Sequence, residues 1–214
     1  MFEKNSKLLI IGDSITDCGR ARPVGEWGGL GNGYMSYIDA LLQVGYPELG
    51  IRVVNQGISG DTTRHLRARW DSDVIAQKPD YLGVMIGVND VWRSFDNPHI
   101  KEACVPLEEY TAILRELLAK TTAKKVFLMT PFFLELNKSD KFRAKLDTYC
   151  VAVKAIAEEM GHEFVDIQAA FDAFMERGVY GMTISGDRVH PNGMGSLLIA
   201  KTFLKAAGFD FGVM

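Results

Sequence analysis

Hydrophobic positions along this sequence fall into two patterns that alternate from one end of the chain to the other. The first pattern is a short, continuous apolar run, and it recurs five times, over residues 8–11, 53–54, 81–86, 126–129 and 164–167. Continuous rather than alternating apolar runs are typical of strands buried on both faces of a parallel sheet. We therefore predict five buried parallel strands.

The second pattern is a helical period between these runs. One predicted helix carries Leu107, Tyr110, Ile113, Leu114, Leu117 and Leu118 on one face, and a second carries Phe142, Leu146, Tyr149, Cys150, Val153, Ile156, Ala157 and Met160. Further helical periods cover residues 34–42, the residues Leu66, Trp70 and Val74, and a last helix with Leu197, Leu198, Phe203 and Leu204. The glycine-rich stretch 25–33 is predicted to be a loop.

Alternating strands and helices predict an α/β fold in three layers, α/β/α, with right-handed crossovers. The common order for five strands of this kind is 2-1-3-4-5, as in flavodoxin-like folds. No repeat, linker or low-complexity tract interrupts the pattern, so residues 1–214 are expected to form one domain.

Composition narrows the class of protein. The hydrophobic fraction of 47% and the charged fraction of 24% are ordinary for a soluble globular protein, and a net charge of -3 offers no basic surface for nucleic acid. No apolar run approaches the ~20 residues that span a bilayer, and the first residues do not read as a signal peptide. The three cysteines, Cys18, Cys104 and Cys150, lack metal-like spacing and indicate a cytoplasmic protein without disulfides.

Polar residues that could do chemistry follow three of the predicted strands. Ser14 stands two places beyond the glycine that ends the first run, Gly60 precedes the helix after the second, and Asn89 follows the third. In the 2-1-3-4-5 order these three strand ends are neighbours, and ligands bind at that edge of an open sheet. Taken singly, each is explained equally well by a turn or a helix cap.

A serine hydroxyl needs an adjacent base before it acts as a nucleophile. His190 lies three residues after Asp187 and just before the last predicted helix, so the aspartate can orient its imidazole. The alternative is a surface Asp–His pair beside a helix start. The other histidines, His65, His99 and His162, have no clustered carboxylate or cysteine, so no metal site and no cofactor are predicted.

These segments, in this order, resemble the four blocks of the SGNH (GDSL) hydrolase superfamily: Gly12-Asp13-Ser14, Gly60, Gly87-Val88-Asn89-Asp90 and Asp187-Arg188-Val189-His190-Pro191. The resemblance spans nearly the whole chain. It implies an SGNH-hydrolase fold, a catalytic triad of Ser14, Asp187 and His190, and an oxyanion hole made by Ser14, Gly60 and Asn89.

Two longer stretches, residues 12–23 and 86–93, are similar to intracellular acetylxylan esterases of bacilli. That resemblance implies a cytoplasmic homo-oligomer that removes acetyl groups from xylo-oligosaccharides. The sequence departs from those relatives at Gly186, where they carry a tryptophan just before the triad aspartate.

We therefore expect a serine esterase that removes O-acetyl groups from an acetylated carbohydrate, with no metal, cofactor, nucleic-acid or membrane partner. The alternatives are a lysophospholipase or thioesterase with the same triad, and a non-catalytic carbohydrate-binding protein. The side chains expected to contact substrate are Asp13, Arg20, Trp27, Asp61, Arg64 and Trp92. For Arg20 and Arg22 the competing interpretation is pairing with local carboxylates, and for the two tryptophans it is packing.

Overall fold

Six strands form one sheet in the computed structural model, which describes residues 1–96, 99–100 and 103–212. The strands are β1 (Lys7–Gly12), β2 (Gly25–Glu26), β3 (Arg52–Gly57), β4 (Tyr81–Met85), β5 (Lys125–Met129) and β6 (Glu163–Val165), in the order β2-β3-β1-β4-β5-β6. The five predicted strands are β1, β3, β4, β5 and β6, all parallel. Their predicted order is confirmed.

The sixth strand, β2, corrects the prediction of a plain loop over residues 25–33. Gly25 and Glu26 pair antiparallel with Asn55 and Val54, and a 3-10 turn, Trp27–Gly29, follows. A two-residue strand has no hydrophobic period to detect, and it forms because the edge of β3 offers unpaired backbone groups. The last strand is also shorter than predicted, because Asp166 caps the helix that begins at Ile167.

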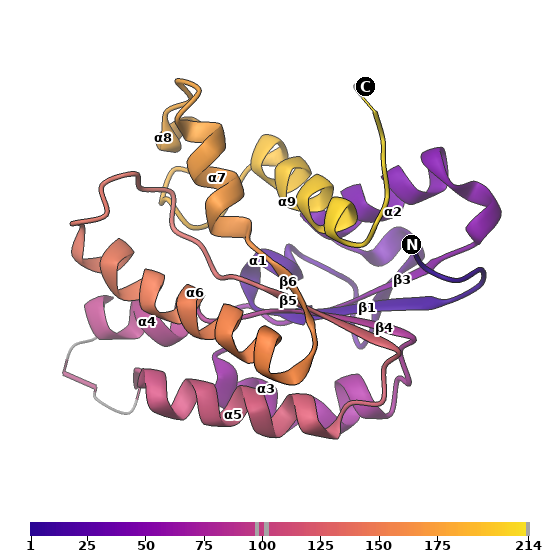
Figure 1. Ribbon diagram of the computed structural model, residues 1–214, viewed down its shortest axis with the longest axis horizontal. Coiled ribbons are helices and arrows are strands. Elements are labelled where there is room, and N and C mark those ends of the chain that lie inside the picture. The colour runs from indigo at the N-terminus through magenta and orange to yellow at the C-terminus, as the bar shows by residue number, and fades with distance from the viewer. Residues whose placement is uncertain (97–98, 101–102, 213–214) are drawn as a thin grey trace.

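Helices cover both faces of the sheet (Figure 1). Helices α2 (Tyr34–Gly45), α7 (Ile167–Met175) and α9 (Gly193–Ala206) lie on one face, and α3 (Thr63–Trp70), α4 (Val88–Asp96), α5 (Leu107–Lys120) and α6 (Lys141–Met160) lie on the other. The described residues also form the short helices α1 (Ser14–Asp17) and α8 (Gly181–Ile184), a 3-10 turn at Pro47–Leu49 and a π-helical turn at Asp71–Ile75. This is the predicted three-layer α/β/α arrangement.

The apolar faces predicted for the long helices pack in the core. In α5, the five residues from Tyr110 to Leu118 that share the predicted face are buried, and in α6 so are Leu146, Tyr149 and Val153. Leu66, Trp70 and Val74 are buried too, although the chain passes from α3 into the π-helical turn between Trp70 and Val74. In the described residues no helix is long and apolar enough to cross a bilayer.

Strand register brings the proposed chemistry to one edge of the sheet. Gly12, at the end of β1, lies opposite Gly57 of β3 and Met85 of β4. Glycine is needed at position 57 because a Cβ there would stand 2.2 Å from the backbone nitrogen of Asp17. The close approach lets α1 start directly over the neighbouring strand end.

Candidate active site

Ser14 is the first residue of α1, immediately after the carboxyl end of β1. The preceding residue, Asp13, is the N-cap, and its Oδ1 accepts a hydrogen bond of 3.0 Å from the backbone N–H of Ile15. Such a cap fixes the first turn of a helix. The serine hydroxyl is therefore held at the sheet edge by a short strand-to-helix turn.

The late loop brings a histidine and an aspartate to this hydroxyl. Oγ of Ser14 lies 2.8 Å from Nε2 of His190, and Nδ1 of His190 lies 2.6 Å from Oδ2 of Asp187. Ser14 and His190, which are 176 positions apart in the sequence, are thus in hydrogen-bond contact, and Asp187 is hydrogen-bonded to the same histidine. A nucleophile, a base and an orienting carboxylate in this arrangement can carry out acyl transfer.

The Asp187 carboxylate accepts several hydrogen bonds. Its Oδ1 accepts hydrogen bonds from the Ser185 hydroxyl at 2.7 Å, the Val189 N–H at 2.9 Å and the His190 N–H at 2.8 Å. Partial burial raises the pKa of Asp187, but these bonds and the one to the His190 ring outweigh it and bring the pKa below its usual range. The side chain is therefore an anion at neutral pH.

Gly60 and Asn89 line the same cavity as Ser14 and His190, a hollow of about 350 Å³. The Asn89 amide donates one hydrogen bond of 3.0 Å to the backbone carbonyl of Asp61. A primary amide carries two hydrogens, so a second N–H donor remains on this side chain. Gly60 has φ of +86°, a conformation that favours glycine.

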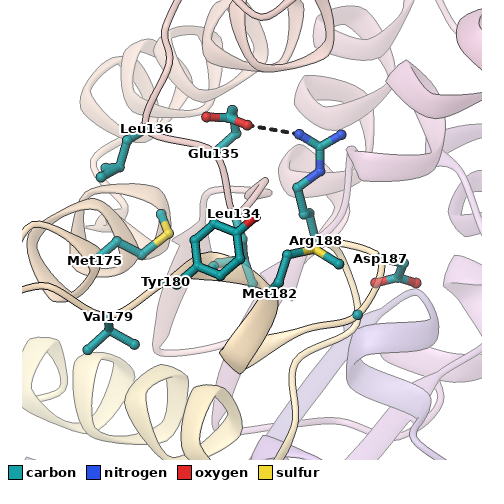
Figure 2. A pocket seen from close by; sticks show the side chains of 11 residues that line it. Leu134, Glu135, Leu136, Met175, Val179, Tyr180, Met182, Asp187 and Arg188 are labelled. Carbon is teal, nitrogen blue, oxygen red and sulfur yellow. Dashed lines mark hydrogen bonds and ion pairs between the residues drawn. The ribbon is translucent and has the colours of Figure 1, made fainter.

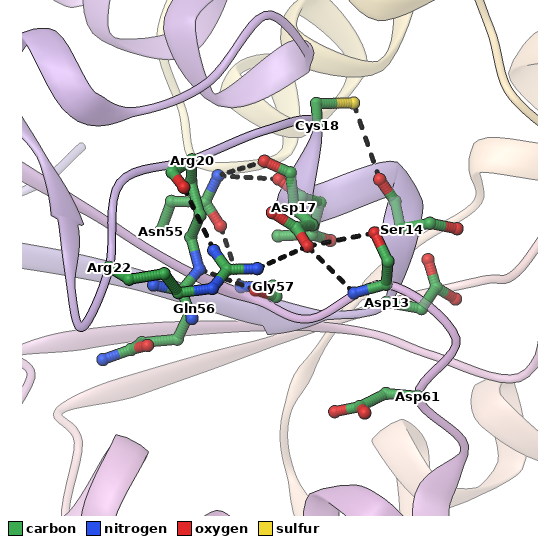
Figure 3. Close-up of polar contacts among 12 residues, drawn as sticks. Asp13, Ser14, Asp17, Cys18, Arg20, Arg22, Asn55, Gln56, Gly57 and Asp61 are labelled. Carbon is green, nitrogen blue, oxygen red and sulfur yellow. Dashed lines mark hydrogen bonds and ion pairs between the residues drawn. The ribbon is translucent and has the colours of Figure 1, made fainter.

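Polar contacts beneath the serine tie α1 to the loop after β3 (Figure 3). Oδ2 of Asp17 accepts hydrogen bonds from the Ser59 N–H and hydroxyl, at 2.9 and 3.0 Å, and from Arg22 at 2.7 Å. The amide of Asn55 donates to the carbonyls of Thr16 and Leu30. These contacts hold the Ser14 and Gly60 segments in a fixed relation.

Of the six side chains expected to contact substrate, the structure places Trp92 in the cavity with Ser14 and His190. Its ring centroid lies 6.1 Å from that of His190, and it meets Phe142 edge to face. Trp92 can therefore offer a ring face to a ligand held at the serine.

The other five are not among the residues that line this cavity. Asp13, Arg20 and Asp61 are 2%, 5% and 6% exposed. They face protein groups: Arg20 donates to backbone carbonyls that include that of Gly57, and Asp61 pairs with Arg69. Arg64 forms an ion pair with Glu109, and the exposed Trp27 is not among the residues that line this cavity. Arg22 forms an ion pair with Asp17, in agreement with the interpretation that this arginine pairs with a local carboxylate.

Three lining residues were missed by sequence reasoning: Ser59, Arg93 and Asp96. The sequence does carry a signal for Arg93 and Asp96. Helix α4 begins at Val88, and the positions three, four and seven residues after Asn89 lie on the same helical face as Asn89. These positions are Trp92, Arg93 and Asp96. Arg93 and Asp96 form an ion pair at 2.6 Å beside the site.

A larger cavity of about 610 Å³ adjoins the far side of Asp187 (Figure 2). Its wall is about equally polar and apolar, and its polar groups include the ion pair between Arg188 and Glu135. The apolar side chains that line it are Leu134, Leu136, Met175, Val179, Tyr180 and Met182. Gly186 borders this cavity, and a Cβ there would meet no atom within 4 Å. The position thus leaves room where the bacillar relatives carry a tryptophan.

Among the described residues, no three His, Cys, Asp or Glu side chains form a group that could hold a metal ion. The arrangement of Ser14, His190 and Asp187 suits acyl transfer through a serine.

Comparison with known proteins agrees with this geometry. The model of the GDSL-like Lipase/Acylhydrolase family matches residues 10–197. An acetylxylan esterase from Geobacillus stearothermophilus is 54% identical over 209 residues, which are 96% of this chain and 95% of the relative.

Solved structures lead to the same group of proteins. The crystal structure of Axe2, an acetylxylan esterase from Geobacillus stearothermophilus, superposes with a TM-score of 0.95 at 53% identity, over 97% of this chain and 96% of that one. Catalytic mutants of Axe2 with a serine, a histidine or an aspartate replaced by alanine superpose with a TM-score of 0.95 at 52% identity, over 98% of this chain and 97% of those. LAE5, an α/β hydrolase from the metagenome of Lake Arreo, Spain, is 45% identical with a TM-score of 0.94, over 97% of each chain.

Proposed function

Because the chain belongs to the GDSL-like lipase/acylhydrolase family and is a carboxylic ester hydrolase, we propose that it removes O-acetyl groups from xylo-oligosaccharides or similar acetylated sugars. The proposal rests on one observation, the hydrogen-bonded series Ser14, His190, Asp187, of which Ser14 and His190 line the cavity together with Trp92 and Arg93. The acetyl and sugar specificity rests on the 54% identity to an acetylxylan esterase.

In the proposed reaction, Ser14 Oγ attacks the ester carbonyl while its proton passes to Nε2 of His190. The tetrahedral intermediate collapses when His190 gives this proton to the departing sugar oxygen, which leaves an acetyl-enzyme and a free sugar hydroxyl. Water then attacks the acetyl carbonyl with His190 again as base, and acetate and the serine hydroxyl are released. Asp187 holds the ring orientation and offsets the imidazolium charge in both halves.

The negative oxygen of each tetrahedral intermediate is stabilised by three donors: the backbone N–H groups of Ser14 and Gly60 and the side-chain amide of Asn89. Donors fixed before the reaction are worth about 3 kcal/mol each in comparable acyl-transfer enzymes. All three residues line the cavity that holds His190, which supports these roles.

Substrate selection follows from the walls of the cavity. Trp92 supplies a ring face suited to the apolar face of a sugar, and the Arg93–Asp96 pair and Ser59 supply hydrogen-bonding groups for its hydroxyls. A hollow of about 350 Å³ matches a small acyl group and one sugar unit better than a long acyl chain.

The second candidate is a lysophospholipase or thioesterase on the same triad. One observation favours it: the cavity of about 610 Å³ next to Asp187 is lined in part by apolar side chains and is large enough to hold an acyl chain. Ser14 and His190 are not among the residues that line that cavity, so we rank this function second.

We also propose that the enzyme is a cytoplasmic homo-oligomer that works without metal or cofactor. The cysteines Cys18, Cys104 and Cys150 are unpaired, as suits a reducing compartment. Tyr180 and Met182, beside the cavity of Figure 2, expose 73% and 46% of their surface, and apolar side chains gathered in this way often cover one another between subunits.

The deciding experiment compares kcat/KM for acetylated xylo-oligosaccharides with kcat/KM for a lysophospholipid and a long-chain acyl thioester, because this ratio measures discrimination between substrates. We expect acetate release from the sugars to be faster by at least about 100-fold. Preference for the long-chain substrates would replace the proposal with the second candidate. No hydrolysis of any of the three would overturn both.

A further inference from the structure

Arg69, near the end of α3, forms hydrogen bonds with several segments next to the proposed site. Its Nη2 donates to the carbonyl of Gly12 at 3.1 Å, and its Nη1 donates to the carbonyl of Gln56 at 2.8 Å. Gly12 and Gln56 stand at the carboxyl ends of β1 and β3. One planar guanidinium therefore joins the strand end that leads to Ser14 with the strand end that leads to Gly60.

Two carboxylates complete the surroundings of this side chain, which is 13% exposed. Nε donates to Oδ2 of Asp61 at 2.7 Å, and Nη1 donates to Oδ2 of Asp73 at 2.8 Å. Burial raises the pKa of the Asp61 carboxyl, and the Arg69 cation acts against that rise. The cation thus favours the ionised, hydrogen-bond-accepting form of Asp61.

The contact with Asp61 continues to the amide of Asn89. The backbone carbonyl of Asp61 accepts a hydrogen bond of 3.0 Å from Nδ2 of Asn89. Because a primary amide is planar, fixing one of its N–H groups also fixes the direction of the other. Gly60 directly precedes Asp61, so the positions of both donors depend on where this short segment is held.

The start of α3 is hydrogen-bonded to Asp90, the residue after Asn89. Oδ1 of Asp90 accepts hydrogen bonds from the backbone N–H and the hydroxyl of Thr63, at 3.0 and 2.6 Å. Helix α3 therefore contacts the residue after Asn89 at its start and the Asp61 segment near its end. A rigid helix between two such attachments can keep the Gly60 and Asn89 donors in register.

We infer that Arg69 is a positioning residue for the oxyanion hole: through Gly12, Gln56 and Asp61 it fixes the relation between Ser14, Gly60 and the Asn89 amide. The inference rests on the proposed roles of those three residues. A guanidinium that only neutralised Asp61 and Asp73 would affect stability and leave the chemical step unchanged.

The test is a double-mutant cycle on p-nitrophenyl acetate. Arg69→Met keeps the apolar stem and removes every donor, and we expect kcat to fall roughly 10- to 100-fold while KM stays within about threefold. In the Asn89→Ala background the same change should lower kcat by a clearly smaller factor, because one of the donors that Arg69 positions is already gone. Arg69→Lys, which keeps the charge without the planar fork, should recover only part of the rate.

Arg67→Met is the matched control, since Arg67 lies on the same helix with 47% of its side chain exposed. It should change kcat by less than about twofold. Equal losses from Arg69→Met in both backgrounds, or a folded Arg69→Met protein with the parent kcat, would overturn the inference. If Arg69→Met does not fold, Arg69→Lys is carried through the same cycle and judged by the same two outcomes.

The result also separates this inference from the proposed function. If Ser14→Ala leaves the parent protein active, the esterase mechanism itself fails. If Ser14→Ala is inactive and Arg69 behaves like Arg67, only the positioning role of Arg69 fails.

Discussion

Oδ2 of Asp187 lies 2.6 Å from Nδ1 of His190, three residues further along the chain. The same carboxylate accepts the backbone N–H of His190 through its other oxygen. The aspartate therefore sets both the backbone and the ring of the histidine, and it leaves Nε2 to face Ser14. Removing the charge of Asp187 should therefore disturb the base that faces Ser14.

Replacing Asp187 by asparagine should abolish most of the activity without unfolding the protein. The amide keeps the size of the side chain but no longer favours a hydrogen on Nδ1 of His190, so the ring no longer presents a base to Ser14. We expect kcat on p-nitrophenyl acetate to fall by about 10³- to 10⁴-fold. Glu158→Gln, on an exposed side chain of α6, is the control; a folded Asp187→Asn protein within tenfold of the parent would contradict the triad.

The two tryptophans near the sequence motifs should behave differently. Trp92 lines the cavity of Ser14, whereas Trp27 is 73% exposed and does not. Trp92→Ala should lower kcat/KM for an acetylated xylo-oligosaccharide by about tenfold, and more than it lowers kcat/KM for p-nitrophenyl acetate, because only the sugar uses the ring face. Trp27→Ala should leave both ratios near those of the parent. Equal effects of the two substitutions on the sugar would contradict a platform role for Trp92.

Much of this site could be predicted because parallel strands end at one edge of a sheet. Once the strand order was inferred, Ser14, Gly60 and Asn89 had to meet, and the register of Gly12 with Gly57 and Met85 accounts for it. The side chains of the connecting loops could not be predicted in this way. Arg20 and Asp61 point inward because of the Gly57 carbonyl and Arg69, partners set by tertiary packing and not by local pattern.

The edge strand β2 was missed for a related reason. Its two residues pair through their backbones with Asn55 and Val54, and backbone pairing leaves no trace in side-chain periodicity. Arg93 and Asp96, by contrast, lie at helical intervals from Asn89, so that extending the helical pattern past the motif would have found them.

Replacing either of two glycines by alanine should affect the free energy of unfolding very differently. A Cβ at Gly57 would stand 2.2 Å from the backbone nitrogen of Asp17, whereas a Cβ at Gly186 would meet nothing within 4 Å. Gly57→Ala should lower the free energy of unfolding by at least about 2 kcal/mol, since the backbone of α1 must shift. Gly186→Ala should change it by less than about 0.5 kcal/mol. Urea denaturation of both variants checks this, and a stable Gly57→Ala protein would contradict the close packing of α1 on β3.

A buried acid beside the nucleophile should shape the pH dependence of stability. Burial raises the pKa of Asp13 to about 7, and the nearby carboxyls of Asp90 and Asp61 add to the rise. The folded state therefore binds this proton more tightly than the unfolded state, in which an aspartate has a pKa of about 3.9. The contribution is complete below about pH 4 and is lost as pH rises toward 7, at up to about 1.4 kcal/mol per pH unit.

Asp13→Asn removes that dependence, because an amide stays neutral and its oxygen can still accept from the Ile15 N–H. The free energy of unfolding of the variant, relative to the parent, should rise between pH 4 and pH 7 and stay flat below pH 4. Urea denaturation across this range measures the difference. A difference that does not change with pH would show that Asp13 titrates alike in the folded and unfolded states.

The most direct test of the serine mechanism is the rate of ester hydrolysis by Ser14→Ala. The Ser14 hydroxyl, 2.8 Å from Nε2 of His190, is the only group assigned to form the acetyl-enzyme. We predict a folded protein with an unfolding midpoint close to that of the parent and with kcat on p-nitrophenyl acetate lower by at least about 10⁴-fold. Ser72→Ala, on the exposed π-helical turn, should keep the parent rate. A folded Ser14→Ala protein that retained a tenth or more of the parent rate would contradict the serine mechanism.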